Sequence, residues 1–332
     1  MLEQLPAAPF FTPNPKQQET RFYPSIEHFQ TLPEIEQLRL ATIWAALAGA
    51  RAAYAALTGP SSDNLGVVFK QDATPKTKVD VASDVGIIKV LQYFRPQDKI
   101  ITEESDYIAP LLNSNREEGE TNTFFVDSCD GTRLVTEQKD GATVGVAAYD
   151  KDDNYHSAAI VHLARNQLAY ASRGKGGHLV GLTESFEITG LPQRLSVDPS
   201  PSLNKATVAI DSLFTNANRT IKLQLMDTLT RLSMDREKTN MSFDLIGSNI
   251  GYQFDVARGA TVLGITDCKG GDWDWRVGYP IIAEAGGTMI DPLTGDSPTS
   301  TSEVVIYGNR DIVELVKPHV GFYYANYPGF SR

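Results

Sequence analysis

We interpret the chain outward from one stretch, Thr123-Phe124-Phe125-Val126-Asp127-Ser128-Cys129-Asp130-Gly131-Thr132. Its β-branched and aromatic residues predict a buried strand, which stops abruptly at two carboxylates followed by Gly-Thr. If the turn opens into a helix, Asp127 and Asp130 lie on one side of it, and the backbone N–H groups of Gly131 and Thr132 point outward. Hard anionic ligands beside such donors would hold a divalent cation and a phosphate together. Taken alone, the pattern also fits an ordinary surface turn.

The composition indicates a soluble globular protein, large enough for one big domain or for two domains that share an interface. Among its 332 residues, 41 acids outnumber 30 bases, and the formal net charge is -11. This charge argues against duplex nucleic acid or an anionic membrane as the partner. A small phosphorylated metabolite remains open as a partner, because metal ions can invert the local charge of a pocket.

Cysteine content and hydropathy bear on the location of the protein. The two cysteines, Cys129 and Cys268, favour a reducing, cytoplasmic compartment over a disulfide framework. The first residues show no signal-peptide pattern. The most apolar helical segment, Ala41 to Leu57, contains Arg51 and many alanines, so we expect a packed helix rather than a membrane span.

We divide the chain into three parts. Residues 1–33 are expected to form an extended N-terminal arm, because they contain repeated prolines: Pro6, Pro9, Pro13, Pro15, Pro24 and Pro33. Residues 34–197 are expected to form an N-terminal α+β domain, and residues 198–332 a C-terminal α/β domain. The loose stretch from Pro192 to Pro201 separates the two.

The N-terminal domain is expected to begin with a helix from Pro33 to Leu57 and a second helix that starts near Asp80 or Ser83. Asp80 and Asp84 lie on one face of that second helix, where Asp80 fits a helix cap. A short strand then ends at Glu103-Glu104. After Thr132 the sequence predicts an antiparallel meander of strands at Thr143–Tyr149, Ser157–Leu163, Leu168–Ser172 and His178–Val180.

The second half alternates strands with helices, which predicts an α/β layer. The expected strands are Ala206–Ile210, Thr261–Ile265, Thr288–Ile290 and Glu303–Tyr307. The expected helices are Asn216–Leu232, Gly247–Arg258, one that follows Gly271-Asp272-Trp273-Asp274-Trp275 and runs through Ala285, and Arg310–Pro318.

Several motifs, in this order, resemble the inositol monophosphatase family, whose superfamily includes bisphosphate nucleotidases and fructose bisphosphatases. They are Glu103-Glu104-Ser105, Asp127-x-x-Asp130-Gly131-Thr132, and Trp273-Asp274 followed by Glu284-Ala285-Gly286-Gly287. The resemblance spans most of the chain. It implies a layered αβαβα sandwich of the sugar-phosphatase type, with a mostly antiparallel N-terminal sheet and a smaller C-terminal α/β layer. It also implies lithium-sensitive hydrolysis of a phosphate monoester with Mg²⁺, and a homodimer.

The resemblance assigns roles by position. Two or three Mg²⁺ ions would be held by the main-chain carbonyl of Cys129 and by four carboxylates, those of Glu103, Asp127, Asp130 and Asp274. Glu103 and Thr132 would share the attacking water, and Asp84 would lie near a third, weaker metal. The amides of Gly131 and Thr132 would hold the phosphate. The leaving group would face Gly247, Ser248, Asp267, Lys269 and Arg276.

The chemistry independently supports a metal site. A phosphate monoester carries about two negative charges, so its hydrolysis needs charge neutralisation and an activated water. Crowded carboxylates would repel one another without cations. Ligands that offer only oxygen select Mg²⁺ over ions such as zinc.

Some residues depart from the family pattern. Ser128 and Cys129 replace the usual proline and aliphatic residue between the ligands, and no aromatic follows Thr132 closely. Trp275 and Arg276 are bulkier than the usual residues after the last ligand. These departures remove no side-chain ligand, but they leave the substrate open.

We therefore expect a phosphomonoesterase whose substrate is an inositol or sugar monophosphate. One alternative is a 3′(2′),5′-bisphosphate nucleotidase. Another is a non-catalytic relative that keeps the fold and binds a phosphorylated metabolite or a protein partner.

Overall fold

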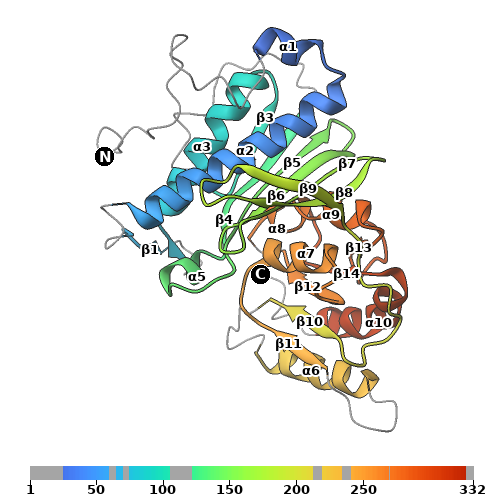
Figure 1. Cartoon of the computed structure of the whole chain (residues 1–332). Helices are drawn as coiled ribbons and strands as arrows, with labels where there is room; N and C mark the ends of the chain where they lie inside the picture. The colour runs from blue at the N-terminus through green and yellow to red at the C-terminus, as the bar shows by residue number, and fades with distance from the viewer. Residues whose placement is uncertain are drawn as a thin grey trace.

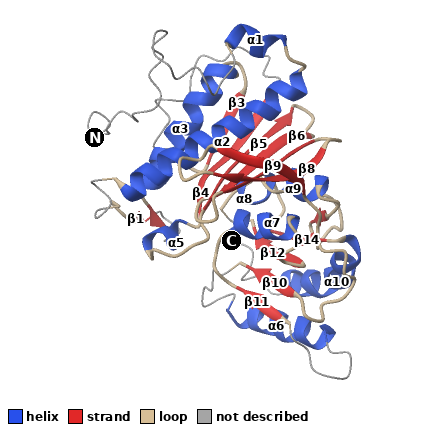
Figure 2. Cartoon of the chain, in the orientation of Figure 1, coloured by secondary structure: helices blue, strands red, loops and turns tan. Residues whose placement is uncertain are grey.

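The computed structural model describes residues 25–59, 65–69, 75–104, 122–211, 219–233, 241–268 and 270–326. These residues form five layers in the order helices, sheet, helices, sheet, helices (Figure 1 and Figure 2). The predicted αβαβα sandwich is confirmed. Residues 1–24, most of the expected arm, lie outside the described residues.

The first sheet has seven strands that follow one another in sequence order: β3 (Lys99–Thr102), β4 (Asn122–Asp130), β5 (Thr143–Asp150), β6 (Tyr155–His162), β7 (Gln167–Ser172), β8 (Gly176–Leu182) and β9 (Ile188–Arg194). The β3–β4 pair is parallel, and every later pair is antiparallel, as the predicted meander requires. Strand β9 was not predicted, because all seven of its residues are exposed and it contains Gly190 and Pro192.

Helices α2 (Glu34–Thr58) and α3 (Lys78–Phe94) cover the outer face of this sheet (Figure 1). Among the described residues, α2 is the helix that is long and apolar enough to cross a membrane. It is instead packed here, because its buried residues join the core formed with α3 and the sheet. This agrees with the packed helix expected from the sequence.

Part of the expected extended arm is helical. Helix α1 (Ile26–Thr31) follows Ser25, whose side chain accepts a hydrogen bond from the His28 amide at 3.2 Å. The buried ring of Phe29 packs against Trp44 and Phe94. The expectation of extended chain was therefore wrong for this segment, because a side-chain cap and a buried aromatic stabilise a helix there.

The middle layer contains α7 (Asn249–Ala257), α8 (Trp273–Arg276) and α9 (Tyr279–Glu284). The sequence predicted one helix from the region of Asp274 through Ala285, but the structure has two short ones. Pro280 lies in the first turn of α9, where its missing N–H breaks no helical hydrogen bond. The proline thus begins a helix instead of interrupting one.

The second sheet has the strand order β11 (Ser242–Asp244), β10 (Thr207–Ile210), β12 (Leu263–Asp267), β14 (Val304–Gly308) and β13 (Thr288–Ile290). Strand β10 runs parallel to β11 and β12, while β14 is antiparallel to both of its neighbours. The first sheet ends at Arg194 and the second begins at Thr207; the domain boundary after residue 197 stays a prediction.

Helices α6 (Arg219–Ser233) and α10 (Arg310–Asn326) cover the far face of the second sheet. The predicted end of the last helix at Pro318 was wrong. The helix continues because Val320 and Tyr324 extend the buried stripe that Val316 belongs to. Three short elements complete the described fold: β1 (Val68–Phe69), β2 (Pro75–Lys76) and α5 (Thr132–Thr136).

Candidate active site

The carboxylates Asp127 and Asp130 lie at the end of β4, where the strand register shifts between them. Gly131 follows with φ of 83°, a left-handed conformation that strongly favours glycine, and α5 begins at Thr132. A β-carbon on Gly131 would also lie 3.3 Å from Ser248 Cβ. The predicted sequence of strand, turn and helix is therefore confirmed, and glycine is required at its bend.

Thr132 is positioned by a residue from the start of α3. Its hydroxyl donates to Asp80 Oδ1 at 2.6 Å and lies 3.0 Å from the carbonyl oxygen of Cys129. Asp80 also accepts hydrogen bonds from the backbone and side chain of Thr77, which complete a capping box. The expected cap is confirmed, but the contact with Thr132 was missed. The Thr-x-x-Asp spacing of Thr77 and Asp80 signals the capping box. No local pattern signals the contact between Asp80 and Thr132.

Asp84 lies one helical turn further along α3 and is fully buried. Both of its carboxylate oxygens accept from the hydroxyl of Thr102, at 2.8 and 2.9 Å. Thr102 is the last residue of β3, and Glu103 follows it directly. Asp84 thus supports the strand end that presents Glu103, while Asp80 is the α3 acid that contacts Thr132.

Asp130 joins the two halves of the site. Its Oδ2 accepts from Ser248 Oγ at 2.7 Å and from the Ile250 amide at 2.6 Å. Ser248 is the N-cap of α7, so the carboxylate lies at the positive end of that helix. The predicted residues Gly247 and Ser248 are therefore brought beside Asp130, although Ser248 lies 118 positions away from it in the sequence.

A close helix–sheet contact brings Asp274 to the same place. Gly145 pairs with Asp127 across the β4–β5 ladder, and a β-carbon on Gly145 would lie 2.4 Å from Val277 Cγ1. The missing side chain lets the chain around α8 approach the end of β4 closely. Asp274, in α8, is buried there and accepts from the Gly270 amide at 2.9 Å.

The acids at this end of β4 affect one another's ionisation. Burial raises the pKa of Asp274 well above its ordinary value, and nearby Glu103 and Asp130 raise it further. Burial likewise raises the pKa of Asp130, against the hydrogen bonds from the start of α7. Burial raises the pKa of Asp84 to about 8, against the hydrogen bond from Thr102. A bound cation would relieve this mutual repulsion.

The donor set fits Mg²⁺ in chemical type, because Glu103, Asp127, Asp130 and Asp274 offer carboxylate oxygens. Within the described residues, however, no three acidic, histidine or cysteine side chains are gathered closely enough to hold a metal ion as they stand. Asp130 and Asp274 accept backbone hydrogen bonds instead. Cation binding would therefore require these carboxylates to turn toward one another.

The predicted substrate contacts also include Asp267 and Lys269. Asp267 is buried at the end of β12, where it pairs with Lys222 Nζ at 2.9 Å and accepts from the hydroxyl of Tyr324. Its carboxylate is thus committed to α6 and α10. Lys269 lies outside the described residues.

Arg276 is not available to a substrate, which corrects the sequence-based expectation. Its side chain is 5% exposed, and its guanidinium donates to Asp272 and to both carboxylate oxygens of Asp153. The same group lies 4.6 Å from the ring centre of Phe125 and 4.5 Å from that of Trp275. These ion pairs and ring contacts fix Arg276 as a structural anchor.

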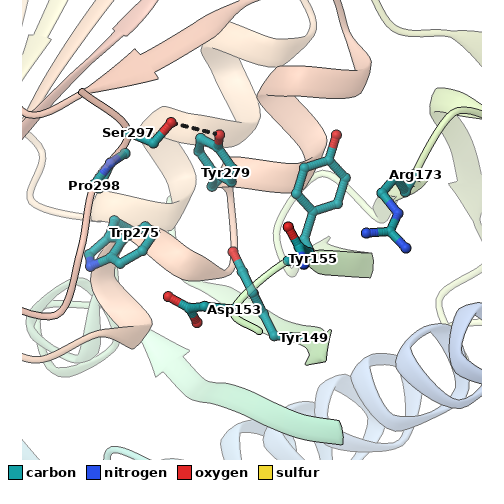
Figure 3. A pocket seen from close by; sticks show the side chains of 9 residues that line it. Tyr149, Asp153, Tyr155, Arg173, Trp275, Tyr279, Ser297 and Pro298 are labelled. Carbon is teal, nitrogen blue, oxygen red and sulfur yellow. Dashed lines mark hydrogen bonds between the residues drawn. The ribbon is translucent and has the colours of Figure 1, made fainter. Parts of the chain in front are cut away.

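Trp275 helps to line a cavity of about 230 Å³. Figure 3 shows the side chains around this cavity. Its other aromatic walls are Tyr149, Tyr155 and Tyr279, and Tyr149 pairs with Thr123 at the opposite end of β4 from Asp130. Trp275 therefore lines this second region, and Arg276 pairs with Asp153, which lines it as well.

Comparisons with known proteins agree with this geometry. A sequence profile described as the inositol monophosphatase family matches residues 40–322. The Nus factor SuhB of Haemophilus influenzae is 27% identical over 256 residues, which make up 74% of this chain and 83% of that protein.

Solved structures show the same fold. The extragenic suppressor protein SuhB of Bartonella henselae has a TM-score of 0.68 and 19% identity, and the match covers 84% of this chain and 96% of that one. The IMPase of Thermotoga maritima has a TM-score of 0.65 and 17% identity, covering 85% and 96%.

Proposed function

Because the chain belongs to the inositol monophosphatase family, we propose that it hydrolyses a small phosphate monoester in a Mg²⁺-dependent reaction. The observation that carries the proposal is the burial of Asp274 in α8 beside the end of β4, where the charges of Glu103 and Asp130 both act on it. Such crowding of acids is costly unless a cation occupies the space between them.

Each residue would have a distinct task. Glu103, Asp127, Asp130, Asp274 and the carbonyl of Cys129 would hold Mg²⁺, which would neutralise the phosphate and acidify the attacking water. Thr132, oriented by Asp80, would align that water, and Glu103 would accept its proton. The amides of Gly131 and Thr132 would hold a phosphate oxygen, as backbone donors at such turns can.

The substrate is proposed to be an inositol or sugar monophosphate. A 3′(2′),5′-bisphosphate nucleotide is the second substrate class, because the fold alone does not separate the two. Gly247 and Ser248, beside Asp130, are the proposed leaving-group contacts. A cytoplasmic homodimer is proposed as the working form.

The test is phosphate release from a panel of inositol, sugar and bisphosphate-nucleotide substrates, with Mg²⁺ and with EDTA. Asp274→Asn, purified in the same way, reports any contaminating phosphatase. We expect release from at least one substrate, loss with EDTA and loss in the variant. Release from none of them, or release that EDTA and the variant leave unchanged, would refute the proposal.

A non-catalytic binding role is the second candidate, favoured by one finding: the Haemophilus relative is called a Nus factor. For this chain, such a role predicts tight binding of a phosphorylated metabolite or a protein without metal and without turnover. Calorimetry with EDTA present distinguishes it, because a hydrolase of the proposed kind needs its cation.

A further inference from the structure

The carboxylate end of the first sheet contains a buried lysine that the proposed function does not use. Lys76 is 1% exposed, in β2 just before α3. Its ammonium forms an ion pair with Glu104, which is 2% exposed. Lysine and glutamate are rarely buried to this degree, and removing both charges from water costs free energy. The position of this pair therefore calls for a function.

The pair lies among the acids of the candidate site. Glu104 directly follows Glu103, and its amide lies 3.3 Å from Thr102 Oγ1, the hydroxyl that donates to Asp84. Lys76, Glu103 and Glu104 all act electrostatically on Asp84. The ammonium is thus a fixed positive charge inside a group of carboxylates, at a distance where single charges still influence one another.

The ion pair affects the net charge at this end of the sheet, because Lys76 offsets the negative charge of Glu104. Acids from several elements act electrostatically on one another or on Cys129 between them, and they are Asp80, Asp84, Glu103, Glu104, Asp127, Asp130 and Asp274. Without Lys76, Glu104 would lose this ion pair, and the group of acids would carry one more net negative charge. That charge would attract a further cation or draw Mg²⁺ away from Glu103.

We propose that Lys76 is a resident positive charge of the metal site, which cancels Glu104 and leaves Glu103 to serve the catalytic Mg²⁺. The proposal rests on the proposed function, since it assumes that Mg²⁺ binds at this end of β4. Lys76 is a positioning residue that acts through Glu104.

The sign of the change in Mg²⁺ affinity separates this role from a merely structural one. Lys76→Met removes a positive charge from this group, so Mg²⁺ should bind about tenfold more tightly, or one additional ion should bind. Glu104→Gln removes a negative charge and keeps the ammonium, so Mg²⁺ should bind about tenfold more weakly. The double variant, Lys76→Met with Glu104→Gln, should bind Mg²⁺ with an affinity within about threefold of that of the wild type.

The experiment is a calorimetric titration of each full-length variant with MgCl₂ at fixed pH and low ionic strength. If the pair only supports the fold, both single substitutions weaken Mg²⁺ binding, or neither changes it; either result overturns the proposal. Lys78→Met is the matched control, because it removes an exposed charge two residues away and should leave the affinity within about twofold.

Two further measurements keep the outcome clear. Circular dichroism verifies folding of each variant, and Lys76→Gln, with the same expected sign, replaces Lys76→Met if that variant does not fold. Wild-type protein that neither binds Mg²⁺ nor releases phosphate would refute the proposed function. Wild-type protein that does both, with unchanged affinity in the Lys76 variants, would refute only the role of Lys76.

Discussion

The hydroxyl of Thr132 donates to the carboxylate of Asp80 at 2.6 Å, although the two residues are 52 positions apart. This bond ties the turn after β4 to the first turn of α3. It fixes the direction of the Thr132 side chain, which then has one orientation toward the acids at the strand end. A residue that caps a helix thus also sets the geometry of the candidate site.

Asp80→Asn should lower turnover by on the order of a hundredfold and leave KM within about threefold. The amide oxygen can still accept from Thr77, so the helix cap and the fold should persist. Thr132, however, loses a charged acceptor and its fixed orientation. Steady-state kinetics at saturating Mg²⁺ test this, and turnover within threefold of the wild type would contradict it.

Asp274→Asn should reduce turnover by at least about a thousandfold while the protein stays folded. Burial and the neighbouring acids raise the pKa of Asp274, so a neutral amide relieves repulsion in the metal-free protein. Its melting temperature without Mg²⁺ should be equal to or above that of the wild type. The rise in melting temperature that Mg²⁺ causes in the wild type should be lost in the variant. Thermal scans with and without MgCl₂ measure both effects.

Asp130→Asn should behave in the same way, whereas Asp296→Asn, an exposed carboxylate outside the site, should keep the full response to Mg²⁺. An unchanged Mg²⁺ response in Asp130→Asn or Asp274→Asn would count against the ligand assignment.

Gly145→Ala should weaken Mg²⁺ binding and cost about 1–3 kcal/mol of unfolding free energy. The added β-carbon would lie 2.4 Å from Val277 Cγ1, so the chain around α8 has to move away from β4. Val277→Ala in the same protein removes the clash and should recover most of the affinity. Denaturant titration and Mg²⁺ calorimetry measure the two effects. A double variant no better than Gly145→Ala would show that the contact does not position α8.

His162 should make the protein less stable in mild acid. Burial, with Arg165 nearby, lowers its pKa to about 4, while an unfolded histidine has a pKa near 6.5. Between these values the unfolded chain binds a proton that the folded protein does not, so the unfolding free energy falls as the pH drops from about 6.5 to about 4. His162→Gln should flatten this slope by about one proton.

Urea denaturation at several pH values measures the slope. The exposed His28→Gln variant should keep the wild-type dependence. Equal slopes for His162→Gln and the wild type would mean that another group controls acid stability.

Arg276→Met should cost about 2–4 kcal/mol of unfolding free energy without changing KM. The buried guanidinium is held by Asp272 and Asp153 and packs against three aromatic rings, which lose these contacts together. Arg173→Met, at an exposed arginine that lines the cavity of Figure 3, should cost about 0.5 kcal/mol or less. A large rise in KM with little loss of stability would restore Arg276 as a substrate contact.

Local patterns in the sequence predicted much of the fold. The strand before Asp127 and the helix over α2 are long, strongly patterned segments, and both were predicted close to their observed bounds. The meander from β5 to β8 followed from alternating apolar residues and turns. Strand β9 gave no such signal, because its residues face solvent and include glycine and proline.

The contacts that assemble the candidate site were harder to predict. Ser248 reaches Asp130, and Lys76 reaches Glu104, only because distant elements fold together. A charged residue such as Lys76 is expected on the surface unless its partner is known. Arg276 was expected to face the leaving group because its positive charge is evident in the sequence, whereas its partner Asp153 is not.

The residues of the candidate site leave the ribosome in the order in which they stand in the sequence. Asp274 comes late in the sequence, after the acids of α3, the acids that follow β3 and those of β4, so a growing chain carries these acids before the last proposed metal ligand. Lys76 precedes every one of them. The chain therefore makes its own counter-charge first, before any acid that needs it has left the ribosome.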